Sequence, residues 1–307
     1  MADDADLGVE DEHDGGLGPP SRGPWRLAVR RYVRRPVGVV ALVVLFALVA
    51  VALEAGRIAR YPVNFVDLAH LNQATGPTLA GRHFFGTDYL GRDLFSQTLY
   101  GLGTSVRIAL MVAASSVLVG VLVGAVAGYR GGWADAILMR GVDVIVTVPV
   151  MVVTLVAFTY FTSLTPIDVG IVLVLYMWTT VARVVRASYA SLREREFVEA
   201  AHALGASPLR IAVRHMLPSS FGVVLVAATA VIGQALVLEA TIDFFNLGTT
   251  QLSGPTLGNL VADATKYGVP INQVPWWSYT FPSLVLVLLL LCVNFVGDSL
   301  DQALAAA

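Results

Sequence analysis

The sequence predicts an all-α polytopic membrane protein with six transmembrane helices. Of its 307 residues, 56% are hydrophobic and only 14% are charged. A single water-soluble core cannot bury that much apolar surface, so much of the chain must face lipid. The apolar residues also gather in six long segments, at 37–53, 108–129, 144–164, 169–182, 216–238 and 276–297.

The segments differ in how clearly they span a membrane. A helix needs about 20 apolar residues to cross the hydrocarbon core, and most of the segments provide them without an internal charge. The fourth is shorter and is bounded by Asp168 and Arg183. It can still span if Arg183 and Arg186 extend toward the headgroups while the helix continues below the membrane. Pro149 lies in the third segment and can kink it.

The arginines predict the orientation of the chain, because cytoplasmic segments of membrane proteins are enriched in basic residues. If the N-terminus is cytoplasmic, the inner segments hold most of the arginines and the outer segments hold few. Both termini are therefore expected in the cytoplasm. Two outer stretches then lie near 54–103 and 243–275, and residues 183–215 form the one long cytoplasmic excursion between spans.

The sequence divides into five regions along the chain. The acidic, Gly- and Pro-rich start is expected to be a disordered cytoplasmic tail. The first apolar segment is expected to be an uncleaved anchor, because its leader is too long for a signal peptide and five more spans follow. The regions are the tail at 1–24, a basic segment with the first span at 25–54, an extracytoplasmic loop at 55–103, a core with five spans at 104–301 and a cytoplasmic tail at 302–307.

Composition excludes several classes of protein. Cys292 is the only cysteine, so there is no disulfide framework, and we interpret it as a packing residue. The soluble parts offer no basic face for nucleic acid. Lys266 is the only lysine and lies in Thr-Lys-Tyr, so the chain lacks the Gly-Lys-Ser/Thr of a P-loop. It also has no hydrolase or dinucleotide motif, and we expect no enzyme activity of its own.

Three glycines recur at four-residue spacing in the second span, at Gly120, Gly124 and Gly128. This spacing lets two helices approach closely. A moving seam between helices is one interpretation. Ordinary packing of membrane helices is the favoured one, because the pattern is common.

The excursion at 191–218 encodes two short helices. Ser191 and Glu194 form an S-x-x-E pattern typical of a capping box, and Gly205 permits the left-handed conformation that ends a helix. Ser207 and Pro208 are typical of a second helix start. The sequence therefore predicts a helix over about 191–205 and a sharp bend at Gly205.

The first of these helices has an apolar face that needs a partner. Phe197, Ala201 and Leu204 recur at helical spacing, whereas charged residues occupy the other faces. A short helix is not stable alone in water, and the small Ala200–Ala201 step lets a partner approach its backbone. We therefore expect this helix to dock into a groove.

The same residues resemble a known motif. Glu199, Ala200, Ala201 and Gly205, followed by Leu217 and Pro218, resemble the EAA loop of binding-protein-dependent ABC importer permeases. In that family a hydrophobic residue stands three positions before the proline, whereas this chain has His215. The motif lies between the fourth and fifth spans, where the family carries it.

Further segments extend the resemblance over nearly everything after residue 25. FGTDYLGRD, GLGTSVRIAL, YRGGWADAILMRGVD and the C-terminal PWWSYTFPSL to NFVGDSLDQAL are similar to the second, C-type permease subunit of dipeptide, oligopeptide and nickel importers. One stretch departs. The family reads FLGLG, a Pro-rich turn and a Trp-Gly pair, where this chain has FFNLGTTQLSGPTLG at 244–258.

The resemblance implies a type I ABC importer permease fold in a bacterial plasma (inner) membrane. The helix at 191–205 would be the coupling helix, seated in a cleft of an ATPase subunit. The implied partners are a second homologous permease, two ATP-binding domains, separate or fused, and an extracytoplasmic substrate-binding protein. No cofactor is implied on this chain, and ATP and Mg would bind to the ATPases. The implied ATPase-coupling residues are Phe197, Glu199, Ala200, Ala201, Leu204, Gly205 and Pro218.

The cargo and the energy source leave alternatives open. The resemblance implies di- or oligopeptides, with nickel or another small solute as the alternative. A secondary transporter is a different class, but internal repeats and broken helices at the midplane are not evident in the sequence. A passive scaffold that anchors a cytoplasmic partner is a third class.

Two groups of polar residues are candidate sites. Glu239 and Asp243 lie four residues apart near the outer end of the fifth span, where they could meet a substrate amino group or a cation. The favoured alternative places both at the water interface or in hydrogen bonds to neighbouring helices. In the first outer loop, His70, His83, Asp88 and Asp93 have no metal-ligand spacing, so loop stabilisation or contact with the binding protein is preferred.

Overall fold

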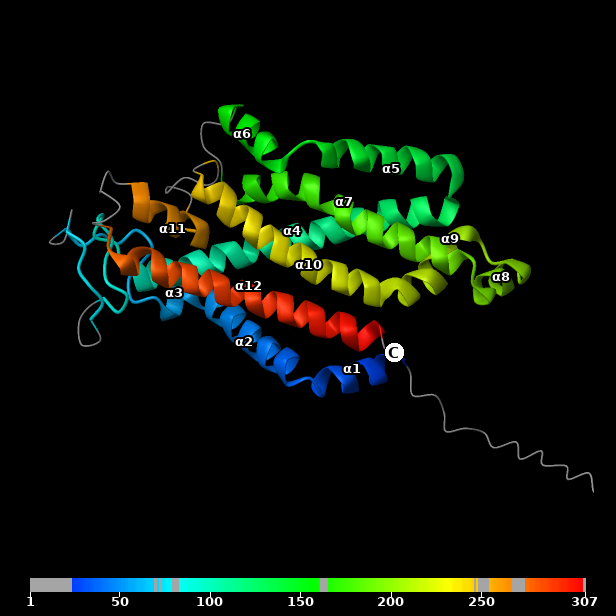
Figure 1. Cartoon of the computed structure of the whole chain (residues 1–307), viewed down its shortest axis with the longest axis horizontal. Helices are drawn as coiled ribbons and strands as arrows, with labels where there is room; N and C mark the ends of the chain where they lie inside the picture. Colours follow the sequence, from blue (N-terminus) through cyan, green and yellow to red (C-terminus); the bar gives the residue numbers. More distant parts are fainter. Residues whose placement is uncertain are drawn as a thin grey trace, which may run out of the picture.

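The structure is a computed structural model, and it describes residues 24–68, 71, 73–78, 83–160, 165–245, 247, 254–266 and 274–305. The predicted disordered tail lies outside these residues, apart from Pro24. In the described part of the chain, long helices lie side by side in an elongated bundle (Figure 1). Five of them are long and apolar enough to cross a membrane, and a bent helix pair provides a possible sixth span. The predicted all-α fold is confirmed.

The helices follow one another in this order: α1 (Pro24–Val33), α2 (Pro36–Leu53), α3 (Ala55–Ile58), α4 (Leu94–Arg130), α5 (Gly132–Thr147), α6 (Val150–Tyr160), α7 (Pro166–Arg193), α8 (Glu196–Ala203), α9 (Pro208–Arg210), a π-helix (Ile211–Met216), α10 (Leu217–Phe244), α11 (Leu257–Lys266) and α12 (Trp276–Ala305).

The third predicted span is not one continuous helix. α5 and α6 are separated by Val148 and Pro149, and the two helices meet at 71°. Val148 is extended, with φ −85° and ψ 121°, because a proline disfavours the helical conformation of the residue before it. The predicted kink at Pro149 is thus confirmed. The short fourth segment does continue as a long helix, α7, as predicted.

Two helices are longer than the sequence predicts. α4 begins at Leu94, because Asp93 caps it by accepting a hydrogen bond from the Ser96 backbone N–H at 2.8 Å. The last part of the predicted 55–103 loop is therefore helical. α12 runs to Ala305, so most of the predicted tail at 302–307 is helical.

The glycines of the second span form the contact between α4 and α7. A Cβ atom on Gly124 would lie 2.5 Å from the Ala182 carbonyl oxygen, and one on Gly128 would lie 2.5 Å from the Arg186 carbonyl oxygen. Real side chains do not approach that closely, so only glycine allows this helix pair to pack. The seam is a close packing contact between the C-terminal turns of α4 and α7.

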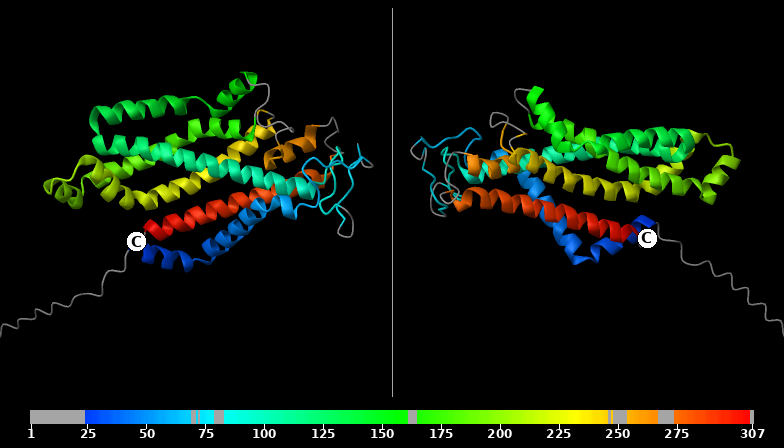
Figure 2. Two further views of the ribbon diagram at one scale, coloured as in Figure 1. Left: turned by 180° about the vertical axis from the view of Figure 1, so that it is seen from behind. Right: turned by 45° about the horizontal axis from the view of Figure 1, so that its top comes forward.

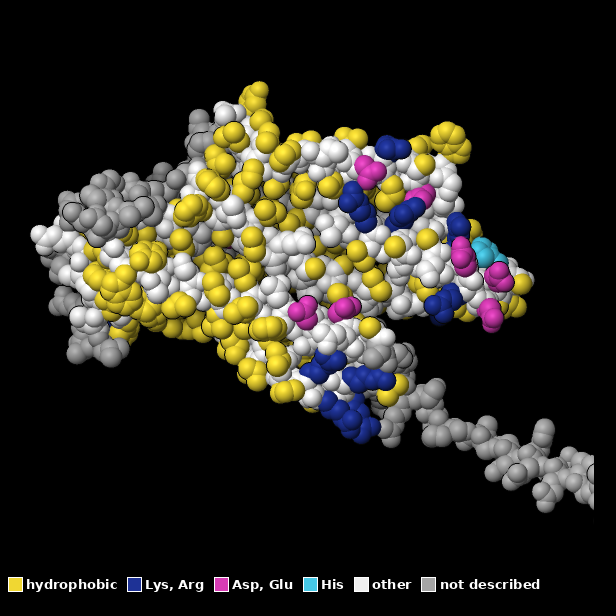
Figure 3. Space-filling model, in the orientation of Figure 1, with side chains coloured by type: hydrophobic (Ala, Val, Ile, Leu, Met, Phe, Trp, Pro, Cys, Tyr) yellow, Lys and Arg dark blue, Asp and Glu magenta, His cyan; other side chains and the backbone are white. Residues whose placement is uncertain are grey.

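The two ends of the bundle differ. α1, α8 and the end of α12 lie at one end, whereas α3, α11 and the loop before α4 lie at the other (Figures 1 and 2). Figure 3 shows charged side chains gathered toward the end with α1 and α8, while hydrophobic side chains cover the middle. The bundle therefore has a hydrophobic girdle and one strongly charged end.

Candidate functional site

α8 projects from the charged end of the bundle and is the predicted docking helix, but it is shorter than expected. It covers Glu196–Ala203, not 191–205. Ser191 lies in the last turn of α7 and Glu194 is the C-cap of α7, so the predicted capping box is wrong. The buried Tyr189, one turn from the end, keeps α7 helical past Ser191.

Gly205 ends α8 as predicted. Its φ of +77° is left-handed, which only glycine adopts at little cost. The Gly205 N–H donates to the His202 carbonyl at 2.9 Å, and the Ala206 N–H donates to the Ala201 carbonyl at 3.0 Å. These two bonds form a Schellman motif, which satisfies the last carbonyls of the helix and turns the chain back.

α8 uses different residues for its buried side and its exposed side. Val198 and Ala201 are buried in the same apolar cluster as Ile211 of the π-helix. Phe197 is 41% exposed and Leu204 is 88% exposed. Ala201 was thus predicted on the docking face but packs inward, and the sequence reasoning did not identify Val198. Phe197 and Leu204 remain as an exposed apolar pair.

The other predicted coupling residues occupy separate places. Glu199 and Ala200 are exposed on α8, and Glu199 lies in its first turn, where a negative charge is favourable. Pro218 is exposed but belongs to α10. His215, at the position that departs from the family pattern, is exposed in the π-helix.

A π-helix joins the docking segment to α10, and the sequence analysis missed it. Ser207 is extended and Pro208 opens α9, as predicted, although the Ser207 side chain makes no capping bond. The Leu217 N–H then donates to the Ala212 carbonyl, five residues back. The Tyr189 hydroxyl donates to that same carbonyl at 3.1 Å. Pro218 was the available signal, because a proline inside a helix removes one N–H and distorts the turn before it.

Ion pairs fasten α5 to α7 near the same end. Arg186 donates from Nε and Nη2 to the two carboxylate oxygens of Asp135 at 2.6 and 2.5 Å. Arg183 donates to Asp143 at 3.0 Å. Both arginines were expected to reach toward headgroups, and each instead has a carboxylate partner.

At the opposite end, the first outer loop is held by a polar network. His83 Nδ1 lies 2.8 Å from Asp93 Oδ1, and both side chains are buried. Asp88 accepts from Arg92 Nε at 2.6 Å, and Arg92 also donates to Asp263 of α11 at 3.0 Å. This arrangement favours loop stabilisation. No cluster able to hold a metal ion occurs among the described residues, and His70 lies outside them.

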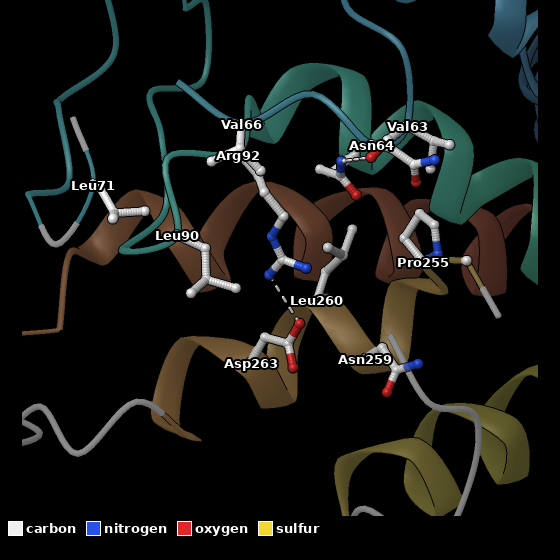
Figure 4. A pocket seen from close by; sticks show the side chains of 12 residues that line it. Val63, Asn64, Val66, Leu71, Leu90, Arg92, Pro255, Asn259, Leu260 and Asp263 are labelled. Carbon is white, nitrogen blue, oxygen red and sulfur yellow. Dashed lines mark hydrogen bonds and ion pairs between the residues drawn. The ribbon is translucent and has the colours of Figure 1, made fainter. Parts of the chain in front are cut away.

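A cavity of about 370 Å³ opens between this loop and α11 (Figure 4). Arg92 and Asp263 form an ion pair across it, and Leu90 and Leu260 contribute apolar surface. The cavity lies beside Gly254 and Pro255, within the 244–258 stretch that departs from the family pattern. Residues 246 and 248–253 of that stretch lie outside the described part of the chain.

Glu239 and Asp243 are buried and bonded to neighbouring elements. The Ser105 hydroxyl of α4 donates to the Glu239 carboxylate at 3.0 Å and accepts from the Leu257 N–H at 3.2 Å. Thr256, just before α11, donates to Asp243. This geometry favours a role in holding α11 on α4 and α10. The predicted contact with substrate stays a prediction.

The chain matches two families of known proteins. Residues 120–307 match the binding-protein-dependent transport system inner membrane component, and residues 23–75 match the N-terminal TM domain of oligopeptide transport permease C. A putative peptide permease protein of Brucella suis is 36% identical over 93% of this chain and 92% of its own. The oligopeptide transport system permease protein OppC of Mycobacterium tuberculosis is 35% identical over 92% and 94%.

The fold also resembles a solved structure. The MetNI methionine ABC transporter, in an inward-facing conformation, matches with a TM-score of 0.56 at 20% identity. The match covers 69% of this chain and 97% of that chain. At this identity the likeness concerns the fold, and it agrees with the predicted type I permease architecture.

Proposed function

This chain belongs to the family of binding-protein-dependent transport system inner membrane components, and from that premise we propose that it forms half of the pathway by which an ATP-driven importer carries di- and oligopeptides. The observation that carries the coupling part of the proposal is the exposed apolar pair Phe197 and Leu204 on α8. Water-exposed apolar side chains on a short helix favour a protein partner.

The partner at α8 is an ATPase subunit. The chain has no P-loop lysine, so ATP and Mg bind to two ATP-binding domains, separate or fused. A second homologous permease completes the pathway, and an extracytoplasmic binding protein delivers cargo to the outer end. When the ATPases close, the force enters through α8 and the π-helix and reaches α10, which carries Glu239 and Asp243.

The membrane is the bacterial inner membrane, and both termini are cytoplasmic. α1, the end of α12 and α8 lie at one end of the bundle, which is the arginine-rich end. This arrangement supports the orientation, because basic segments stay on the cytoplasmic side.

Peptide cargo is supported by the relatives, which are named as peptide and oligopeptide permeases. Nickel or another small solute is the alternative cargo. Uptake by the reconstituted transporter, measured with labelled di- and oligopeptides against excess Ni²⁺, distinguishes the two. Competition by unlabelled peptide and not by Ni²⁺ is expected.

The coupling proposal is tested by changing Phe197 and Leu204 together to Ser. Burial of two apolar side chains in the interface contributes to the free energy of binding, so the affinity for the ATPase should fall by at least about tenfold in the variant. ATP-dependent uptake should fall with it. Binding is measured with purified ATPase subunits and uptake in vesicles.

Trp133→Ser is the matched control. Trp133 is 85% exposed and lies at the start of α5, on a different helix from the α8 pair. Wild-type ATPase binding by the α8 variant, or equal losses in both variants, would contradict the docking role. Uptake that persists without any ATPase would contradict the ATP-driven importer itself.

A further inference from the structure

α1 has a side that nothing in the described structure covers. Its inner side is packed, because Ala28 is 5% exposed and the Tyr32 hydroxyl donates to the Gly38 carbonyl at 3.0 Å. Val29 and Val33, one turn apart, are 61% and 63% exposed. The helix is therefore fixed to the bundle on one side and presents an apolar face on another.

The next helix, α2, is a candidate membrane span and also exposes apolar side chains. On α2, Val37 is 57% exposed and Val40 is 61% exposed. α2 has the highest mean hydropathy of the candidate spans, 2.9, and only 17% of it is buried in the bundle. Only Arg34 and Arg35 separate the two helices. Exposed apolar side chains therefore occur on both helices, on either side of Arg34 and Arg35.

Four arginines lie at the junction between α1 and α2, close in sequence to the exposed valines of α1. Arg30, Arg31, Arg34 and Arg35 fall within six residues, and none forms an ion pair with a carboxylate among the described residues. Arg35 bonds the Gln302 side chain. Arg31 Nη1 is buried without a hydrogen-bond partner in the described structure. Within the described part of the chain, no carboxylate pairs with these guanidinium groups.

We propose that α1 is an interfacial anchor that binds the phosphate groups of anionic phospholipids. Its Val29–Val33 face enters the acyl-chain boundary, and the adjacent arginines hold the headgroups. A guanidinium matches a phosphate through two parallel hydrogen bonds, and the basic residues here are all arginine. Basic segments next to a span are attracted to anionic lipid surfaces.

The anchor would restrain one end of the bundle. α1 precedes α2 directly, and Arg35 reaches α12 through Gln302. A Cβ on Gly38 would lie 2.6 Å from Ser299 Cβ, so α2 and α12 are in close contact here. Bound headgroups therefore hold α1, α2 and α12 at the membrane surface while other helices move.

The first test measures where the apolar face lies. The full-length chain, with Cys292→Ala and Val29→Cys, is labelled with a nitroxide and reconstituted in vesicles of phosphatidylglycerol and phosphatidylcholine. Collisions with oxygen should exceed those with a water-soluble nickel chelate. The matched control is Leu204→Cys, on an 88% exposed residue of α8, which should give the reverse. A water-accessible label at position 29 overturns the proposal.

The second test measures the headgroup contact. Arg30, Arg31 and Arg34 are changed together to Gln, and phosphatidylglycerol retained by the purified chain is counted by native mass spectrometry. Each arginine near an anionic surface increases the affinity for that surface roughly fivefold, so the amount of retained lipid should fall sharply. The same positions changed to Lys keep the charge but lose the two parallel hydrogen bonds, so retention should lie between that of the Gln variant and that of the wild type, which excludes a folding defect.

The matched control changes Arg195, Arg210 and Arg214 to Gln, with the same loss of charge at the same end, and should leave retention near wild type. If the α1 variant retains as much phosphatidylglycerol as the control, the arginines have another partner, such as the acidic residues at 3–14, and the proposal is overturned.

Discussion

At the scale of single residues, the absence of a side chain decides how α4 and α7 pack. Gly124 lies where a Cβ would be 2.5 Å from the Ala182 carbonyl oxygen and 2.9 Å from Val185 Cβ. One of these atoms is backbone, so a repacked side chain cannot relieve the contact. A methyl group here must move α4 away from α7.

Gly124→Ala is expected to destabilise the chain by about 1–3 kcal/mol, the usual cost of overpacking. Thermal unfolding in detergent measures the change. Gly141→Ala on α5 is the control, because a Cβ there meets nothing within 4 Å. It should be neutral or slightly stabilising. Equal effects of the two changes would refute the close packing at Gly124.

Gly205 is needed for its backbone conformation and not because a side chain there would clash. A Cβ there also meets nothing within 4 Å, yet its φ is +77°. Gly205→Ala should cost about 1–2 kcal/mol, because alanine disfavours the left-handed conformation. Faster hydrogen exchange in α8 and reduced ATP-dependent uptake are expected.

Gly205→Asn should be milder than Gly205→Ala, because asparagine tolerates the left-handed region. Gly56→Ala provides the control for an open glycine without positive φ. Unchanged exchange in Gly205→Ala would show that the Schellman turn does not hold α8.

At the scale of elements, the π-helix lies between α8, the proposed docking helix, and α10. It places the buried Ile211 and Met216 under α8, and Tyr189 fixes its widened turn at the Ala212 carbonyl. Wide turns of this type often occur at functional positions. The route from α8 to α10 therefore passes through one irregular segment.

Pro218→Ala is expected to convert part of the π-helix to α-helix, because it restores the N–H that pairs with the Arg214 carbonyl in an α-helix. Such a change alters the orientation of α8 relative to α10. Uptake per ATP hydrolysed should fall, and hydrogen exchange near Leu217 should change.

Pro208→Ala is the matched control for Pro218→Ala. Pro208 opens α9, where the missing N–H needs no partner, so little change is expected. Wild-type coupling and exchange in Pro218→Ala would mean that Pro218 does not cause the wide turn.

At the scale of the whole molecule, the two ends of the bundle should face opposite sides of the membrane. In a Cys292→Ala background, Leu204→Cys reports the α8 end and Leu68→Cys reports the outer loop, since the two residues are 88% and 78% exposed. In right-side-out vesicles, an impermeant maleimide should label position 68 only. After the vesicles are opened, position 204 should react as well. The reverse pattern would invert the proposed orientation.

The sequence by itself determined the features that depend on composition and on local chemistry. The apolar segments indicated a membrane protein, Gly205 predicted a left-handed turn and Pro149 predicted a kink. Each follows from one residue type or from a run of residues, so no tertiary information was needed.

The tertiary structure decided which neighbouring element each of several side chains packs against. Ala201 packs inward with Val198 although its spacing matched the exposed face, because α8 lies on the π-helix. Ser191 stays in α7, where Tyr189, two residues earlier, is buried, and the arginines of α7 pair with carboxylates of α5. These contacts join residues that are distant in the chain. The spacing of residues within one helix does not predict which distant element will pack against it.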